Sequence, residues 1–503
     1  MNSATLASLA AYFILMLAIG LYAWRRSTGD SAGYLLAGRN LPPSVAALSA
    51  GASDMSGWLL LGLPGALYAT GLVEAWIGIG LFIGALANWV LVAPRLREQT
   101  ERIGNALTIP QFLANRFPER GTALRVTSAI IIVAFFTVYT AAGLVGGGKL
   151  FETAFAGILP NTGLSDYMLG IVITAGIVLA YTMVGGFLAV SLTDFVQGLI
   201  MMGALVIMPL VVMFGPGGSA GGSLTEVPIE GFLDLTYGLT AIGFISAVTW
   251  GLGYFGQPHI IVRFMAINRV ENVRRAAAFG MGWMGIALLG SIGLGIAGRA
   301  YAERNGLVVD DPETIFIVLA QLLFHPAVTG FLYAALLAAI MSTISSQLLV
   351  SSSSLTEDFY RLFLRRNASE REAVNVSRGA VALVAVAAIV IAADPNSQVL
   401  GLVSNAWAGF GAAFGPLILL ALMWHGKDGT HGTGMTGAGA VAGLVTGAGV
   451  VAGWIALGWN AQLPAALGGG PGLYEIVPGF AAAMAAIIVV SKFTRPNNAK
   501  GAL

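Results

Sequence analysis

Apolar runs of about 20 residues recur along the whole chain, and they restrict its fold more than any other feature. Each run is long enough to cross the ~30 Å hydrocarbon core of a bilayer as a helix. Charged residues make up 10% of the 503 residues, against about 25% in soluble domains. The chain therefore cannot cover a water-facing surface, and the sequence predicts an all-α polytopic integral membrane protein.

Hydropathy and turn signals predict about thirteen transmembrane helices. The N-terminal run is too long for a signal-peptide core and lacks a basic leader, so we interpret it as a retained first span. No linker or composition break divides the chain, so residues 1–503 are predicted to form a single transmembrane domain. The spans are placed at roughly 4–24, 43–70, 72–94, 126–156, 167–185, 187–214, 238–257, 276–298, 328–362, 379–394, 397–424, 434–459 and 472–491.

The basic residues predict which side of the membrane each loop faces. All but three of the 25 Lys and Arg residues fall on one side with this placement; the exceptions are Lys149, Arg299 and Arg304. Excess positive charge marks the cytoplasmic face. The N-terminus is then outside and the C-terminus inside, and Arg263 lies in a cytoplasmic loop. Short helices are predicted within the inner loop at 105–117 and the outer segment 301–325.

Asp54 lies in the middle of the second span, in "SAGASDMSGW". A carboxylate at membrane depth is costly and by default suggests function. Gly51 and Gly57 flank it and are expected to loosen the helix, which would free backbone carbonyls and amides to line a cavity. The alternative is a carboxylate that pairs with a neighbouring helix, or faces a water-filled crevice, for packing specificity alone.

A second irregular span, "TWGLGYFGQPHI" at 249–260, carries three glycines and Pro258, which cannot donate a backbone hydrogen bond. Two interrupted spans in corresponding halves indicate the binding site of a secondary transporter. They are the second and seventh spans, so two five-span repeats would cover about 43–214 and 238–424. An odd number of spans in each repeat inverts their topology. The extra helices are 4–24, 434–459 and 472–491.

The ninth span carries two adjacent hydroxyls, Ser342 and Thr343, in "AAIMSTISSQ". Such hydroxyls can simply bond back to the preceding turn of their own helix. If this helix lies against the interrupted second span, the two hydroxyls and three freed carbonyls would form an oxygen site suited to Na+. Asp194, near the cytoplasmic end of the sixth span, is either a helix-start carboxylate solvated from inside or a residue that receives a departing cation.

Enzymatic chemistry and nucleic-acid binding find little support in the sequence. The chain has no cysteine, and its four histidines show no metal-ligand spacing. The segment "GLVGGGKL" lacks both the Ser/Thr and the strand-to-helix context of a phosphate-binding loop. The net charge of +1 implies no nucleic-acid partner. No obligate protein partner is evident, and membrane lipid is the expected surrounding.

Five stretches carry a more specific signal: "SAGASDMSGWLLLGLPGALY", "GGFLAVSLTDFVQ", "WGLGYFGQPHI", "AAIMSTISSQLLVSSSSLTEDFY" and "GLVSNAWAGFGAAFGP". They closely resemble the sodium/solute symporter family, nearly from end to end. The resemblance implies thirteen helices, an external N-terminus and a LeuT-type 5+5 inverted-repeat core. It also implies Na+-coupled uptake of L-proline by alternating access in the bacterial cytoplasmic (inner) membrane.

The resemblance also assigns residues, position by position. Asp54 and Asp194 match acidic residues tied to cation coupling and passage; Asp54 is expected to act indirectly, because five oxygens close the Na+ site without it. The implied Na+ ligands are the carbonyls of Ala52, Met55 and Ala339 and the hydroxyls of Ser342 and Thr343. The implied proline-binding residues are Ser56, Gly57, Trp58, Tyr139, Trp250, Tyr254, Gln257 and Pro258.

Several alternatives stay open. Within the family, the solute is alternatively pantothenate, a sugar or a short carboxylate, and lithium or protons are alternative coupling ions. From other classes, an ion channel would need a continuous pore, and a transport-linked sensor would be expected to carry a cytoplasmic signalling domain.

Overall fold

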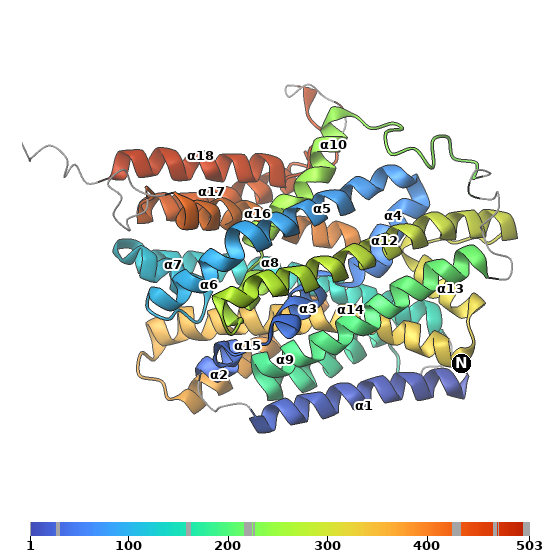
Figure 1. Cartoon of the computed structure of the whole chain (residues 1–503), viewed down its shortest axis with the longest axis horizontal. Helices are drawn as coiled ribbons and strands as arrows, with labels where there is room; N and C mark the ends of the chain where they lie inside the picture. The colour runs from blue at the N-terminus through green and yellow to red at the C-terminus, as the bar shows by residue number, and fades with distance from the viewer. Residues whose placement is uncertain are drawn as a thin grey trace, which may run out of the picture.

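The computed structural model describes residues 2–26, 31–156, 162–215, 224, 227–424, 434–465, 470 and 472–495. Within this part of the chain every regular element is a helix, and most of the long helices run close to the longest axis of the molecule (Figure 1). Eleven of them are long and apolar enough to cross a membrane, by length and composition. The two interrupted spans lie among the shorter helices.

The first half of the described chain contains α1 (Ser3–Arg26), α2 (Ser31–Leu36), η1 (Ala37–Arg39), α3 (Pro43–Asp54), η2 (Trp58–Gly62), α4 (Leu63–Thr70), η3 (Leu72–Glu74), α5 (Ala75–Ala87), η4 (Asn88–Val92), α6 (Ala93–Arg102), α7 (Ile109–Arg116), η5 (Pro118–Arg120), α8 (Gly121–Ala154) and α9 (Asp166–Phe214). The second half contains α10 (Ala241–Val248), η6 (Thr249–Gly256), α11 (Pro258–Ala266), η7 (Val270–Asn272), α12 (Val273–Asn305), η8 (Pro312–Thr314), α13 (Ile315–Leu323), α14 (Pro326–Ser353), η9 (Ser354–Leu364), α15 (Glu370–Ala392), α16 (Val399–Met423), α17 (Gly437–Ala456) and α18 (Ile476–Thr494).

Each predicted span coincides with a helix or a run of helices, but the seventh is longer than predicted. Pro258 does not end it; this residue is the first of α11, where a missing N–H costs nothing. The apolar run therefore continues to Ala266. The prediction that Arg263 lies in a cytoplasmic loop is wrong, because Arg263 lies in α11 and is fully buried.

The second span is interrupted where it was expected to be, but for a different local reason. Helix α3 ends at Asp54, and Met55 adopts a non-helical backbone (φ −82°, ψ 76°) before η2 begins. Gly57 is helical (φ −50°, ψ −24°), and Gly51 lies inside α3. A Cβ on Gly51 would lie 2.8 Å from the ring of Trp283 on α12. Gly51 therefore permits close helix packing, and the expectation that it loosens the helix is wrong.

The junction of the predicted fifth and sixth spans is Gly186, where α9 is kinked. Its φ of 59° and ψ of −159° lie in a region that only glycine adopts readily. The apolar segments Asp166–Met183 and Gly186–Phe214 are long enough to serve as separate spans.

The predicted outer segment forms η8 and α13, and it is fastened to two other helices. Lys149 of α8 lies 2.6 Å from a carboxylate oxygen of Asp311 and 2.9 Å from one of Glu313. Glu313 in turn accepts hydrogen bonds from the backbone amides of Val399 and Leu400, which start α16. This carboxylate caps the helix and faces its positive end. We call these three side chains the Lys149 cluster.

The predicted inner loops lie at one end of the molecule. In Figure 1, α2, α7 and the C-terminal ends of α1 and α18 lie at the left, and the N-terminal end of the chain lies at the right. Lys427 and Lys500, which the charge argument also counted, lie outside the described residues. Which end faces the cytosol, the single-domain organisation and the repeat bounds stay predictions.

Candidate functional site

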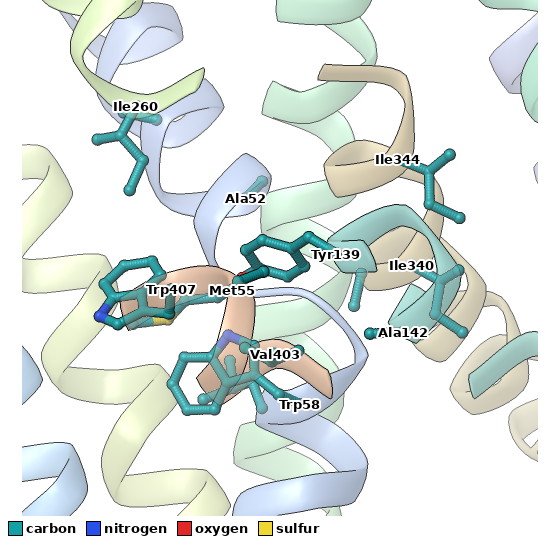
Figure 2. Close-up of a cluster of buried hydrophobic side chains, with 14 of the residues drawn as sticks. Ala52, Met55, Trp58, Tyr139, Ala142, Ile260, Ile340, Ile344, Val403 and Trp407 are labelled. Atoms are coloured by element: carbon teal, nitrogen blue, oxygen red, sulfur yellow. The ribbon is translucent and has the colours of Figure 1, made fainter. Parts of the chain in front are cut away.

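The interruption of the second span is enclosed by helices from distant parts of the sequence. Helix α14 packs against α3, and α16 packs against η6. Figure 2 shows Met55, Trp58 and Tyr139 around the interruption, with Trp407 beside them and Ile340 and Ile344 across from them. The residues of this region are fully or nearly fully buried.

Four of the five oxygens expected to bind Na+ converge. The Ser342 hydroxyl lies 2.7 Å from the carbonyl oxygen of Ala52 and 3.2 Å from that of Ala339. The Thr343 hydroxyl lies 3.5 Å and 3.2 Å from the same two oxygens. Both hydroxyls therefore connect the end of α3 to α14. They bond to the preceding turn of their own helix at Ala339 and also to Ala52 on α3.

The fifth expected ligand is the carbonyl of Met55, at the non-helical residue. Its amide still donates to the Gly51 carbonyl over 2.8 Å. In the described part of the chain, the hydroxyls of Ser342 and Thr343 donate to the carbonyls of Ala52 and Ala339 and not to that of Met55. Among the described residues, no group of three His, Asp or Glu side chains could hold a metal ion. A cation at this position would be bound by neutral oxygens, which suits an alkali cation better than a transition metal.

Asp54 is 2% exposed and contacts the aromatic residues of the predicted proline site. Its Oδ2 accepts a hydrogen bond from the Tyr254 hydroxyl, while its Oδ1 has no protein partner in the described part of the chain. Its backbone carbonyl accepts from the Trp58 indole (3.1 Å) and the Tyr139 hydroxyl (3.3 Å). Three aromatic residues from η2, α8 and η6 therefore meet at one residue.

Ser56 and Gly57 lie at the same turn. The Ser56 hydroxyl is 3.4 Å from the backbone amide of Trp58, and a Cβ on Gly57 would approach Ile340 to 3.3 Å. Gln257 is fully buried, and its amide donates to the carbonyl of Trp407 over 3.1 Å.

The structure does not bring two predicted proline-binding side chains into this group. The Trp250 ring stacks on Tyr474, just before α18, with centroids 5.0 Å apart. Pro258 lines a separate cavity of about 20 Å³ together with Thr108 and Ile109.

Asp194 is fully buried, so the reading of a carboxylate solvated from inside is wrong. Its Oδ2 accepts from the Ser49 hydroxyl over 2.7 Å and from the Arg263 guanidinium over 3.1 Å. Arg263 also donates to Ser346 and to the His259 carbonyl. The pair joins α9 to α11, the helix that continues the interrupted seventh span.

Sequence reasoning missed three residues here. Trp407 packs edge-on against Tyr254 and donates to the Trp250 carbonyl over 2.7 Å; Gly253 makes room for its ring, which a Cβ would approach to 1.9 Å. Arg263 was missed although the apolar run around it continues past Pro258. Asn88, a buried amide in an apolar run, was not considered.

Two interrupted helices that enclose a buried carboxylate and a cluster of oxygens define a multi-pass secondary transporter. The fold is similar to that of a Na+-coupled sialic acid symporter in a substrate-bound outward-open state, with a TM-score of 0.77, 18% identity and coverage of 98% of this chain and 99% of the other. It is also similar to a nucleobase-cation-symport-1 family transporter (TM-score 0.56, 16% identity, 92% and 94% coverage). These likenesses confirm the predicted LeuT-type fold class.

The chain belongs to the sodium:solute symporter family, whose family model matches residues 34–447. It is 50% identical over 482 residues to the high-affinity proline transporter PutP of Bacillus subtilis, covering 95% of this chain and 96% of the relative. It is 49% identical over 490 residues to the osmoregulated proline transporter OpuE of the same organism (97% and 94% covered). A sodium/proline symporter of Staphylococcus aureus is 49% identical over 505 residues (99% and 94% covered).

Proposed function

We propose that this protein takes up L-proline together with Na+ by alternating access, across the cytoplasmic membrane of a bacterium. The observation that carries the proposal is the oxygen cluster in which Ser342 and Thr343 meet the Ala52 carbonyl at the interruption of the second span. Near-half identity to proline transporters over nearly the whole chain supports the choice of solute.

Na+ would be held by the carbonyls of Ala52, Met55 and Ala339 and the hydroxyls of Ser342 and Thr343. The ion would replace the hydroxyl–carbonyl hydrogen bonds that now join these groups and would tie α3 to α14. Na+ and proline then promote each other's binding because each favours a conformation that the other also favours.

Proline would lie beside this site, against the aromatic residues that meet at Asp54. An apolar ring suits the faces of Trp58, Tyr139 and Tyr254, and a carboxylate suits the amides freed at Ser56 and Gly57. The secondary ammonium would lie against carbonyls or aromatic faces. The proposed proline site also includes Gln257, Trp250 and Pro258. The side chains of Trp250 and Pro258 would reach proline only after they move during the transport cycle.

Asp54 would act on the site indirectly, by fixing the interrupted segment between the two ligands. Asp194 would help a cation pass toward the cytosol. No chemical step is proposed, so the protein would not be an enzyme, and no protein partner is invoked. Another small solute, such as pantothenate, a sugar or a short carboxylate, with Na+ or H+ as the coupling ion, is the alternative function.

Proteoliposomes with an imposed Na+ gradient test the proposal. Uptake of labelled L-proline should rise with the gradient and should be outcompeted by unlabelled proline, but not by pantothenate, sugars or short carboxylates. Uptake that does not respond to Na+ would refute the coupling, and competition by another solute alone would refute the substrate.

Two site variants test the oxygen cluster. Ser342→Ala and Thr343→Ala should each raise the Na+ concentration for half-maximal uptake on the order of tenfold, the loss of about one polar contact. Ser353→Ala is the matched control, because among the described residues its hydroxyl bonds to the Val350 carbonyl of its own helix, over 2.8 Å, and to no other group. A Na+ requirement that stays unchanged in both site variants would remove the hydroxyls from the site.

A further inference from the structure

A second cavity lies against Asp54, between α3, the α5–η4 helix, the η6–α11 segment and α12. Its volume is about 20 Å³. Besides the Trp89 indole, the polar side chains that line it are those of Asp54, Asn88 and Tyr254; Met281 and Met284 are among its apolar walls. Neither the proposed Na+ site nor the proposed proline site includes Asn88.

Two side chains in this cavity have unused hydrogen-bonding atoms. Asn88 is 1% exposed, and in the described part of the chain neither atom of its amide has a partner. The Oδ1 of Asp54, also buried, likewise has none there. Buried polar groups are normally hydrogen-bonded to protein or to ordered water. Two residues that line the same cavity thus carry three such atoms, which points to a bound polar ligand.

The backbone of α5 brings Asn88 to this place. Gly84 lies so close to η6 that a Cβ on it would lie 2.2 Å from the carbonyl oxygen of Gly251. One turn further on, Asn88 begins η4, a stretch of π-helix. Turns of π-helix are rare in proteins, and those that occur often lie at functional sites. The contact at Gly84 brings α5 close to η6, and the π-helical turn determines on which side of the helix Asn88 lies.

The size of the cavity selects its ligand. Room for about one water-sized sphere is what a single water molecule needs, together with two or more polar partners. Asn88 and Asp54 supply these partners. A dehydrated cation would find only two side-chain oxygens without a partner in the described part of the chain, Oδ1 of Asp54 and Oδ1 of Asn88, because the Tyr254 hydroxyl already donates to the other oxygen of Asp54.

We propose that one water molecule bridges the Asn88 amide and the free carboxylate oxygen of Asp54, and that Asn88 is a positioning residue for Na+ binding. Tyr254 holds one oxygen of the carboxylate and the water holds the other, so the carboxylate cannot rotate toward the carbonyls of Ala52 and Met55. The inference rests on the proposed Na+-coupled transport.

The effect should be specific for Na+. The backbone carbonyl of Asp54, on the proline side, is held by Trp58 and Tyr139 whether or not the water is present. The carboxylate and the two flanking carbonyls depend on the bridge. Loss of the bridge should therefore weaken Na+ binding and leave proline binding at saturating Na+ nearly unchanged.

Asn88→Leu, which removes both polar atoms and keeps the branched shape of the side chain, tests the inference in proteoliposomes. The Na+ concentration for half-maximal proline uptake should rise on the order of tenfold, while KM for proline at saturating Na+ should stay within about twofold. Binding of labelled Na+ to the purified protein without proline should weaken by a similar factor. Asn88→Ser, whose hydroxyl can still hold the water, should recover most of the wild-type value.

The control is Met208→Leu, a volume-conserving change at another fully buried position, which should alter neither value. The inference is overturned if folded Asn88→Leu keeps the wild-type Na+ requirement, or if its Na+ and proline values change by the same factor. If Asn88→Leu does not fold, Asn88→Ala replaces it, and an unchanged Na+ requirement there is equally fatal. Wild-type uptake that ignores Na+ would instead refute the proposed function.

Discussion

The buried pair of Arg263 and Asp194 allows a quantitative test of how the structure balances charge at membrane depth. The guanidinium and the carboxylate are 3.1 Å apart, with side-chain exposures of 1% and 0%. Removing one partner of such a pair typically costs about 3–5 kcal/mol, because the other charge stays buried without compensation. In Arg263→Met, Asp194 keeps its hydrogen bond from Ser49, so we expect the lower end, about 3 kcal/mol.

Replacing both partners should cost less than replacing one. Apolar pairs of similar volume often equal or exceed a buried ion pair in stability. The double variant Arg263→Met with Asp194→Leu should therefore recover about 2 kcal/mol or more relative to Arg263→Met alone. The measurement is the thermal unfolding midpoint of the purified protein in one detergent at one scan rate, since unfolding of such proteins is often irreversible.

Arg102→Met is the matched control, because Arg102 forms a 3.4 Å pair with Glu98 in which both side chains are more than half exposed. Its cost should stay below about 1 kcal/mol. A double variant that unfolds at or below the midpoint of the less stable single variant would refute the reasoning. That result would mean that the ion pair itself, and not the uncompensated charge, dominates the energy.

Two further predictions concern packing at Trp407 and the Lys149 cluster. Gly253→Ala should sharply reduce proline uptake, because the new methyl group would lie 1.9 Å from the Trp407 indole. Gly449→Ala is the control and should leave uptake unchanged, because a Cβ at Gly449 would have no neighbouring atom within 4 Å among the described residues. Equal uptake in both variants would contradict the packing argument. Lys149→Met should lower the thermal midpoint by leaving Asp311 and Glu313 without their cation; Lys149→Arg should restore part of the loss, and a midpoint equal to wild type would show that the cluster adds no stability.

The positions of the helices could be predicted from the sequence because bilayer thickness fixes the length of each apolar run. The two interruptions were also predictable, since a carboxylate and a Pro-Gly segment each stand out in an apolar span. The meeting of Ser342 with Ala52, by contrast, depends on how α14 packs on α3. Only the resemblance to a family indicated that contact in advance.

Hydropathy could not distinguish a buried arginine from a loop arginine. Arg263 looks like the start of a basic loop until Asp194, 69 residues earlier, is placed beside it. The same limit applies to Gly51. In the sequence it looks like a helix breaker, but in the structure it leaves room for the tryptophan ring of Trp283 on another helix. Both errors arise because one sequence position was interpreted without its partner in space.

The Lys149 cluster has a consequence for how such sequences can vary over evolutionary time. One lysine serves two carboxylates, and one of these carboxylates also closes the start of α16. A neutral residue at 149 would therefore be tolerated most easily together with a neutral residue at 311. Position 313 differs, because its side chain also accepts hydrogen bonds from the backbone amides at the start of α16, whatever residue is present at 149. In related chains we expect positions 149 and 311 to change together, with an acidic or amide side chain retained at 313.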